Sequence, residues 1–169
     1  MTGFERLLNA LAENQAKFII VGAYAAIAHG STQRTDDLDI CYERTPDNYK
    51  NIMKAIGPFH PRPRDLPGDL KVPFDEHSLA QGTNFTLVTD HGKLDLLGEM
   101  SGVGGYKEAL VDAEVINLGG IICRVASLDT VIRSKEAADR PKDRARLPEL
   151  KALQMMNKLK RPERDGHDR

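Results

Sequence analysis

The sequence predicts an α/β (α+β) fold, in which a small mixed β-sheet is flanked by helices and followed by further helices near the C-terminus. Apolar residues recur at helical spacing in some segments and form short strand-like runs in others. These segments follow one another as helix, strand, helix, strand, helix, then two hairpins, then helices, an order that places helices beside a sheet. The 169 residues suffice for one compact core. We expect a single domain over residues 1–159 and a disordered tail over residues 160–169.

The first elements are two helices with a strand between them. Apolar residues at helical spacing predict a helix over residues 3–14. The run KFIIVG, residues 17–22, predicts a short buried strand, and AYAAIAH, residues 23–29, predicts a helix. Gly30 closes this helix, because glycine readily adopts the conformation that follows a helix end.

A second strand and a well-capped helix come next. DLDICYE, residues 37–43, predicts the strand. In the helix that follows, Thr45 is the expected N-cap, Pro46 occupies the first helical position and Gly57 follows the end. Residues 58–82 hold five of the nine prolines and show no periodicity, so we expect a long irregular loop there, of the kind that is often functional.

The remainder of the chain predicts two hairpins and three helices. Alternating apolar runs around a central glycine predict each hairpin. Ser127 is the expected cap of the second helix, and two prolines mark the start of the third. The expected ranges are 83–100 and 113–125 for the hairpins, and 106–111, 128–138 and 148–158 for the helices.

Composition and charge indicate a cytoplasmic protein. A net charge of −1 gives no overall attraction to nucleic acid or to a membrane, so such a partner would need a local patch. Cys41 and Cys123 lie in apolar stretches, which favours small buried thiols in a reducing compartment over a disulfide. The N-terminus predicts an amphipathic helix rather than a signal peptide, and no apolar run is long enough to span a membrane.

Three aspartates interrupt apolar strand patterns. Asp37 and Asp39 are two residues apart, so their side chains point to the same face of the strand. Asp95 lies between leucines in KLDLL. If these strands are neighbours, three carboxylates converge, and a cation would relieve their repulsion. Mg²⁺ is suited to such oxygen ligands and is commonly held by one or two carboxylates together with substrate phosphates.

These pieces resemble the signature of the DNA polymerase beta-like nucleotidyltransferase superfamily. The signature is a strand, a glycine followed by a small residue, a short helix, then D-x-D on the next strand and a later single acid. In VGAYAAIAHGSTQRTDDLDI the first element is Gly22 with Ala23, and the second is Asp37 with Asp39. Asp95 is the third. The superfamily usually has glycine or serine where Ala23 stands, which removes a hydroxyl donor but keeps the backbone amide.

The resemblance spans roughly residues 17–97 and implies the nucleotidyltransferase fold with Mg²⁺ or Mn²⁺ as cofactor. It implies that the metal-binding and catalytic residues are Asp37, Asp39 and Asp95. A strand-to-helix turn at glycine also lets backbone N–H groups approach phosphate oxygens. Gly22 and Ala23 are therefore expected to bind the nucleotide.

A further segment, residues 127–150, resembles the closing helical part of minimal bacterial nucleotidyltransferases that include toxins of abortive-infection toxin–antitoxin pairs. Lys135 lies on the apolar stripe of its helix, where it either extends to the rim or reaches an anion; beside an acidic phosphate site we favour a triphosphate contact. Asp143 has two open interpretations. It either activates the acceptor or pairs with Arg140 or Arg144.

Several other polar residues carry open alternatives. Arg34 and Thr35 precede the paired aspartates and either contact phosphate or form a turn. His29 lies just before Gly30, where a cation suits a helix end, so we interpret it as structural. Two basic sets also have two interpretations each. The first set either contacts an acceptor or is simply solvated, and the second either contacts RNA phosphates or is simply solvated. These sets are Arg62, Arg64 and Lys71 in the loop, and Arg140, Lys142, Arg144 and Arg146 near the C-terminus.

The sequence therefore predicts a metal-dependent nucleotidyltransferase that moves a nucleoside monophosphate from a nucleoside triphosphate such as ATP to an acceptor hydroxyl. The resemblance implies a tRNA 3′ end, a protein or a small molecule as acceptor, and an antitoxin as a partner. The alternative is a degenerate domain of the same fold that binds a nucleotide or a partner without turnover. An antibiotic-modifying enzyme is disfavoured at this stage because no acceptor-binding domain follows.

Overall fold

One seven-stranded mixed sheet forms the centre of the computed structural model, which describes residues 1–67, 70 and 72–160. The strand order is β3-β4-β5-β2-β1-β7-β6. β1 runs antiparallel to β2 and parallel to β7, and β2 runs parallel to β5. The strands are β1 (Phe18–Val21), β2 (Asp37–Tyr42), β3 (Arg62–Pro63), β4 (Asn84–Thr89), β5 (Gly92–Leu97), β6 (Glu114–Leu118) and β7 (Ile121–Val125). The expected fold class is confirmed, with a larger sheet than predicted.

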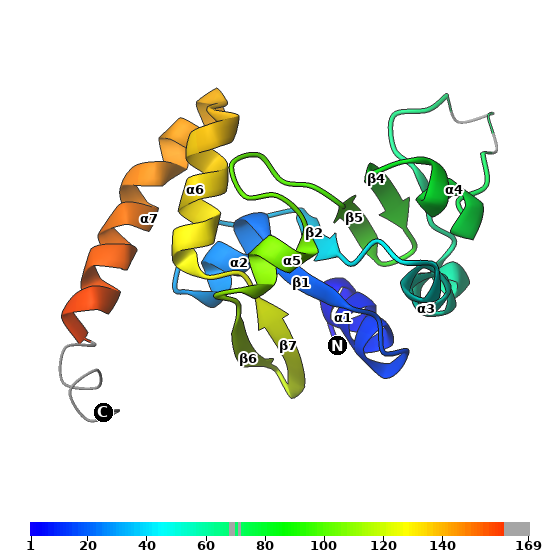
Figure 1. The fold of residues 1–169 in the computed structure, drawn as a ribbon, viewed down its shortest axis with the longest axis horizontal. Coiled ribbons are helices and arrows are strands. Elements are labelled where there is room, and N and C mark those ends of the chain that lie inside the picture. Colours follow the sequence, from blue (N-terminus) through cyan, green and yellow to red (C-terminus); the bar gives the residue numbers. More distant parts are fainter. Residues whose placement is uncertain (68–69, 71, 161–169) are drawn as a thin grey trace.

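Helices gather at both ends of the sheet (Figure 1). α6 and α7 pack side by side at one end, and α3 packs against α4 at the other. The bounds are α1 (Gly3–Glu13), α2 (Gly22–Ala28), α3 (Pro46–Ile56), α4 (Glu76–Gln81), α5 (Tyr106–Leu110), α6 (Leu128–Ala138) and α7 (Pro141–Lys160), with a short 3₁₀ turn at Gly57–Phe59. The Thr45 and Ser127 side chains accept the N-cap hydrogen bonds predicted for α3 and α6.

The prediction of an irregular loop over residues 58–82 was wrong. This segment contains the edge strand β3, which pairs with β4, and the helix α4 with Asp75 as its N-cap. The prolines in this segment argued against a strand. Proline is nevertheless tolerated in an edge strand such as β3, because only one side of an edge strand forms hydrogen bonds within the sheet. Lys71, one of the basic residues for which acceptor contact and simple solvation were both open, lies outside the described residues.

The predicted helix start at Pro148 was also wrong, because α7 is continuous from Pro141 to Lys160. A proline inside a helix removes a hydrogen bond and usually kinks the helix. Packing outweighs that loss here: Leu150 is buried in the core, and the Glu149 carboxylate accepts hydrogen bonds from Ser31 and Thr32. The expected tail lies almost wholly in residues 161–169, outside the described residues.

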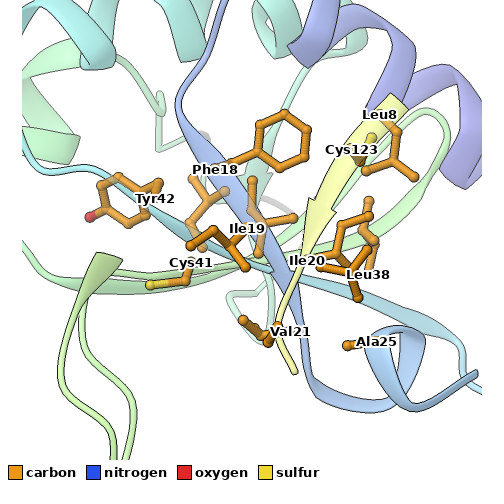
Figure 2. Close-up of a cluster of buried hydrophobic side chains, with 14 of the residues drawn as sticks. Leu8, Phe18, Ile19, Ile20, Val21, Ala25, Leu38, Cys41, Tyr42 and Cys123 are labelled. Carbon is orange, nitrogen blue, oxygen red and sulfur yellow. The ribbon is translucent and has the colours of Figure 1, made fainter. Parts of the chain in front are cut away.

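The core forms around the interior strand β1, which lies between β2 and β7 and whose four residues are all buried (Figure 2). Leu38 of β2 and Leu8 of α1 contribute to the same cluster. Cys41 and Cys123 are buried there as free thiols, as predicted, and burial raises the pKa of Cys41 to about 12 and that of Cys123 to about 11. Both thiols therefore act as core side chains and stay protonated at neutral pH.

His29 ends α2, and its ring Nε2 lies 2.8 Å from the carbonyl oxygen of Ala126 and 3.7 Å from a carboxylate oxygen of Glu114. The side chain is 8% exposed. These contacts join α2 to β6 and to the end of β7, which supports the structural interpretation of this histidine.

Candidate active site

Three carboxylates meet where β2 and β5 lie side by side. These strands are parallel, and their register places Asp39 directly opposite Asp95 and Asp37 opposite Lys93. One oxygen from each of Asp37, Asp39 and Asp95 lies within 4.8 Å of the others. The structure therefore brings together the three acids that the sequence analysis singled out. The remaining question is what compensates their charge.

The cluster is electrostatically strained in the absence of a cation. Burial, followed by the charges of Asp95 and Asp37, raises the pKa of Asp39 from its ordinary 3.8 to about 7. Burial also raises the pKa of Asp95. The Oδ1 atoms of Asp37 and Asp39 are buried and have no hydrogen-bond partner. Buried carboxylate oxygens without partners are costly, and a divalent cation with oxygen ligands would satisfy them.

Arg64 is the one cation among the described residues that forms ion pairs with the cluster. Its guanidinium donates a hydrogen bond of 2.7 Å to Asp95 and lies 3.8 Å from Asp37. A second 2.7 Å hydrogen bond, to the carbonyl oxygen of Leu87, anchors the same group to β4. From the sequence, Arg64 belonged to a basic set that was expected either to contact an acceptor or to be solvated. Its position became clear only from the pairing of β3 with β4, which no sequence pattern indicated.

Gly22 forms the turn between β1 and α2 directly beside this cluster. Its φ angle is +64°, in the left-handed region that side chains rarely occupy. A Cβ at this position would lie 2.3 Å from Oδ2 of Asp39. Glycine is therefore required both by the turn and by the close approach of the carboxylate.

A cleft of about 410 Å³ opens from the aspartates toward α6 and α7. It brings together all the nucleotide-binding residues predicted from the sequence, together with Asp37 and Asp39. These residues are Gly22, Ala23, Arg34, Thr35, Lys135 and Asp143. Asp95 does not line the cleft, and further cationic residues of its wall are Lys93, Arg140, Lys142 and Arg146. Such a wall suits a polyanion such as a triphosphate.

Lys135 and Asp143 form a buried ion pair in the cleft wall. Lys135 Nζ lies 3.6 Å from Asp143, and the side chains are 12% and 1% exposed. Arg140 also contacts Asp143, at 2.7 Å. Burial alone would raise the pKa of Asp143, but hydrogen bonds from Arg140 and the charge of Lys135 hold it below its ordinary value. The pairing interpretation of Asp143 thus gains support, with Arg140 as a partner; Arg144 instead pairs with Asp139.

Thr35 and Arg34 belong to the turn that precedes β2. The Thr35 hydroxyl accepts a hydrogen bond of 3.2 Å from the backbone N–H of Asp37 and donates one of 3.1 Å to its carbonyl oxygen. The Arg34 carbonyl accepts a hydrogen bond from Arg146. These contacts favour the turn interpretation for Thr35, while the exposed Arg34 side chain lines the cleft.

Comparison with known proteins identifies the fold. No protein-family model and no curated protein sequence matches this chain. A solution structure of the antibiotic-resistance factor ANT(2'')-Ia matches it with a TM-score of 0.55 and 14% identity, over 98% of this chain and 95% of that chain. A crystal structure of ANT(2'')-Ia in complex with adenylyl-2''-tobramycin gives a TM-score of 0.58 and 16% identity, over 90% and 87% of the two chains.

A crystal structure of a predicted nucleotidyltransferase from Thermotoga maritima matches with a TM-score of 0.53 and 14% identity, over 92% of this chain and 89% of that chain. The chain therefore has the nucleotidyltransferase fold. This agrees with the superfamily resemblance of the sequence. Within the described residues, no helix is both long and apolar enough to cross a membrane.

Proposed function

We propose that this protein is a metal-dependent nucleotidyltransferase, which transfers a nucleoside monophosphate from a nucleoside triphosphate to an acceptor hydroxyl. The observation that carries the proposal is that three carboxylates converge beside a cleft whose wall is cationic. The two partnerless carboxylate oxygens fit a divalent cation. The fold alone would permit a domain that only binds nucleotide, but such a domain has no need for partly buried, mutually repelling acids.

In this proposal Asp37 and Asp39 hold Mg²⁺ or Mn²⁺, and Asp95 completes the metal site or accepts the acceptor's proton. A bound divalent ion supplies Lewis-acid stabilisation of charge on the phosphate oxygens. The backbone N–H groups of Gly22 and Ala23 and the Lys135 ammonium bind the triphosphate and neutralise the charge of the departing pyrophosphate. The raised pKa of Asp95 brings it closer to that of a useful proton acceptor.

The bond changes follow from this arrangement. The acceptor oxygen forms a bond to the α-phosphorus, and the bond from that phosphorus to the bridging oxygen of the β-phosphate breaks. Pyrophosphate leaves with the bonding electrons, and the hydroxyl proton passes to Asp95 or to water. Burial of the carboxylates helps, because charges act more strongly in a site with little water.

The class of acceptor and the partner protein are also proposals. A tRNA 3′ end, a protein side chain and a small hydroxylated molecule are the candidates, and a toxin–antitoxin role with an antitoxin partner in the cytoplasm remains the expectation from the resemblance. An antibiotic-modifying enzyme, disfavoured from the sequence because no acceptor-binding domain follows, becomes a candidate again on one observation. ANT(2'')-Ia, whose structure includes adenylyl-2''-tobramycin, is matched by this chain over nearly its whole length.

Transfer of label from each of four α-³²P nucleoside triphosphates tests the proposal. Reactions contain Mg²⁺ or Mn²⁺ and total bacterial RNA, a protein mixture or aminoglycosides, with an Asp37→Ala/Asp39→Ala protein in parallel. We expect one acceptor class to gain label with the native protein and none with the double variant. Tight nucleotide binding without label in any acceptor and without pyrophosphate release would instead favour a binding domain.

A further inference from the structure

A second cavity lies on the other side of the three aspartates from the cleft. Its volume is about 670 Å³, and its described lining comprises residues 60–67, Leu70, Val72, Pro73, Val88 of β4 and Lys93 of β5. β2 and β5, which carry the acids, contribute side chains to the cleft, whereas β3 and β4, which lie beyond β5 in the sheet order, contribute to the second cavity. The cleft extends toward α6 and α7, and the second cavity toward β3 and β4. In Figure 1, α6 and α7 lie on one side of β2 and β5, and β4 lies on the other. Lys93 borders both.

This placement matters because phosphoryl transfer puts the attacking and leaving oxygens roughly in line on opposite sides of the phosphorus. If the triphosphate lies in the cleft, as the proposed function states, the pyrophosphate departs toward α6 and α7. The acceptor hydroxyl must then approach from the side of Asp95 and Arg64. The second cavity is the described space that opens on that side, and its size suits a nucleotide-sized or sugar-sized group.

The polar part of the second cavity is positively charged. Arg62, Arg64 and Lys93 line it, and Asp65 is the one carboxylate among the described lining residues. Arg64 is committed to the aspartates. Arg62 is only weakly compensated, since its guanidinium lies 3.9 Å from Asp90, which is itself bonded to His60 at 2.6 Å.

Lys93 forms no ion pair with any described residue. It stands opposite Asp37 in the register and lines both the cleft and the second cavity. A guanidinium and an ammonium at one opening are the groups that bind phosphate oxygens, the arginine through paired N–H donors and the lysine as a point charge. The same charges repel a polycation.

We propose that this cavity binds the acceptor and that the acceptor carries a phosphate group near the hydroxyl that is attacked. The proposal rests on the nucleotidyltransferase function and narrows its acceptor. The phosphate contacts Arg62 and Lys93, and the rest of the acceptor lies against the apolar wall that includes Pro63 and Val88. An aminoglycoside such as tobramycin, which is polycationic, does not fit this charge pattern, whereas a polynucleotide 3′ end or a phosphorylated small molecule does.

Calorimetric titration of three probes tests the proposal, each in the presence of Mn²⁺ and a non-hydrolysable nucleoside triphosphate. The probes are an oligoadenylate with a free 3′ hydroxyl, glucose 6-phosphate and tobramycin. The variant is Arg62→Glu, at a half-exposed side chain that does not line the cleft. The matched control is Lys50→Glu, an exposed charge on α3 that lines neither cavity. Nucleotide binding is measured separately in every protein.

We expect at least one phosphate-bearing probe to bind the native protein and the control alike, and to bind Arg62→Glu about tenfold more weakly or worse, with nucleotide binding unchanged. Binding of the oligoadenylate alone indicates a polynucleotide end, and comparable binding of glucose 6-phosphate indicates a small phosphorylated acceptor. The proposal is overturned if neither probe binds, if Arg62→Glu behaves like the control, or if tobramycin binds most tightly. Failure of nucleotide binding in the native protein would instead contradict the proposed function.

Discussion

Gly22 and Asp39 are in contact across the junction of β1 and β2, so that no side chain fits between them. A Cβ at position 22 would lie 2.3 Å from the Asp39 carboxylate, and the φ angle of +64° disfavours any other residue. We therefore expect Gly22→Ala to lower the free energy of unfolding by about 1–3 kcal/mol for the backbone strain alone. Metal binding should also weaken because Asp39 must move.

Gly57 offers the matched control for that substitution. It lies at the end of α3 with an ordinary helical φ of −51°, and a Cβ there would meet nothing within 4 Å. Gly57→Ala should lower stability only slightly, because a Cβ is disfavoured on a helical residue that precedes a proline, here Pro58, and it should leave Mn²⁺ affinity unchanged. Thermal unfolding and Mn²⁺ titration of both variants measure the difference. Equal behaviour of the two would contradict the close contact described here.

Asp39 should destabilise the metal-free protein, so Asp39→Asn should stabilise it while abolishing metal binding. The pKa of Asp39 rises from 3.8 to about 7, chiefly through burial, and each pH unit corresponds to about 1.4 kcal/mol. At pH 8 with EDTA, the variant should gain up to about 4 kcal/mol. Denaturant unfolding tests this, with Asp36→Asn as the control because Asp36 is exposed and lies outside the cluster. A loss of stability at Asp39→Asn would refute the charge repulsion.

The raised pKa of Asp39 also makes the free energy of unfolding and the metal affinity depend on pH. Between pH 4 and 7 the folded protein holds a proton on Asp39 that the unfolded chain has lost. The contribution of this group to the free energy of unfolding therefore declines as the pH rises through that range and is constant above it. Metal binding must release the proton, so apparent Mn²⁺ affinity should rise about tenfold per pH unit up to about pH 7 and then level off. Titration calorimetry from pH 5.5 to 8.5 measures the slope, and a flat profile would exclude this linkage.

Arg64 should act through Asp95. Burial raises the pKa of that carboxylate, and the Arg64 charge opposes the rise. Arg64→Met should raise the pKa of Asp95 further and move the acidic limb of the kcat/KM profile upward by about one pH unit. Arg64→Lys keeps the charge and should restore most of the profile. If both variants lose activity equally at every pH, Arg64 has a different role, such as direct contact with the acceptor.

Lys135 should bind the triphosphate. Its side chain is 12% exposed and lies in the cleft wall beside Asp143. Lys135→Met should raise the KM for the nucleoside triphosphate by about tenfold or more, because a buried charge-assisted contact to phosphate is lost. Lys151→Met, which removes a half-exposed lysine paired with Glu136, should leave KM unchanged. An equal rise in KM in both variants would instead indicate a general effect of removing a positive charge.

Many of the structural elements of this protein could be predicted from local patterns in its sequence. The capped helix α3, both hairpins and the start of α6 follow from local rules of capping and alternation, which depend on neighbouring residues. The three acids were recognisable because each interrupts an apolar strand, where a carboxylate is expensive without a compensating cation. Their spacing also allowed the superfamily resemblance.

Tertiary structure decided the rest. The strand β3 exists only because β4 offers it an edge, and that pairing brings Arg64 to Asp95. α7 runs through Pro148 because Leu150 and Glu149 gain contacts that outweigh one lost hydrogen bond. The distance between Gly22 and Asp39, and the presence of cavities on both sides of the acids, likewise depend on segments far apart in the sequence. Local patterns thus determine which residues can do chemistry, whereas long-range packing determines which of them meet.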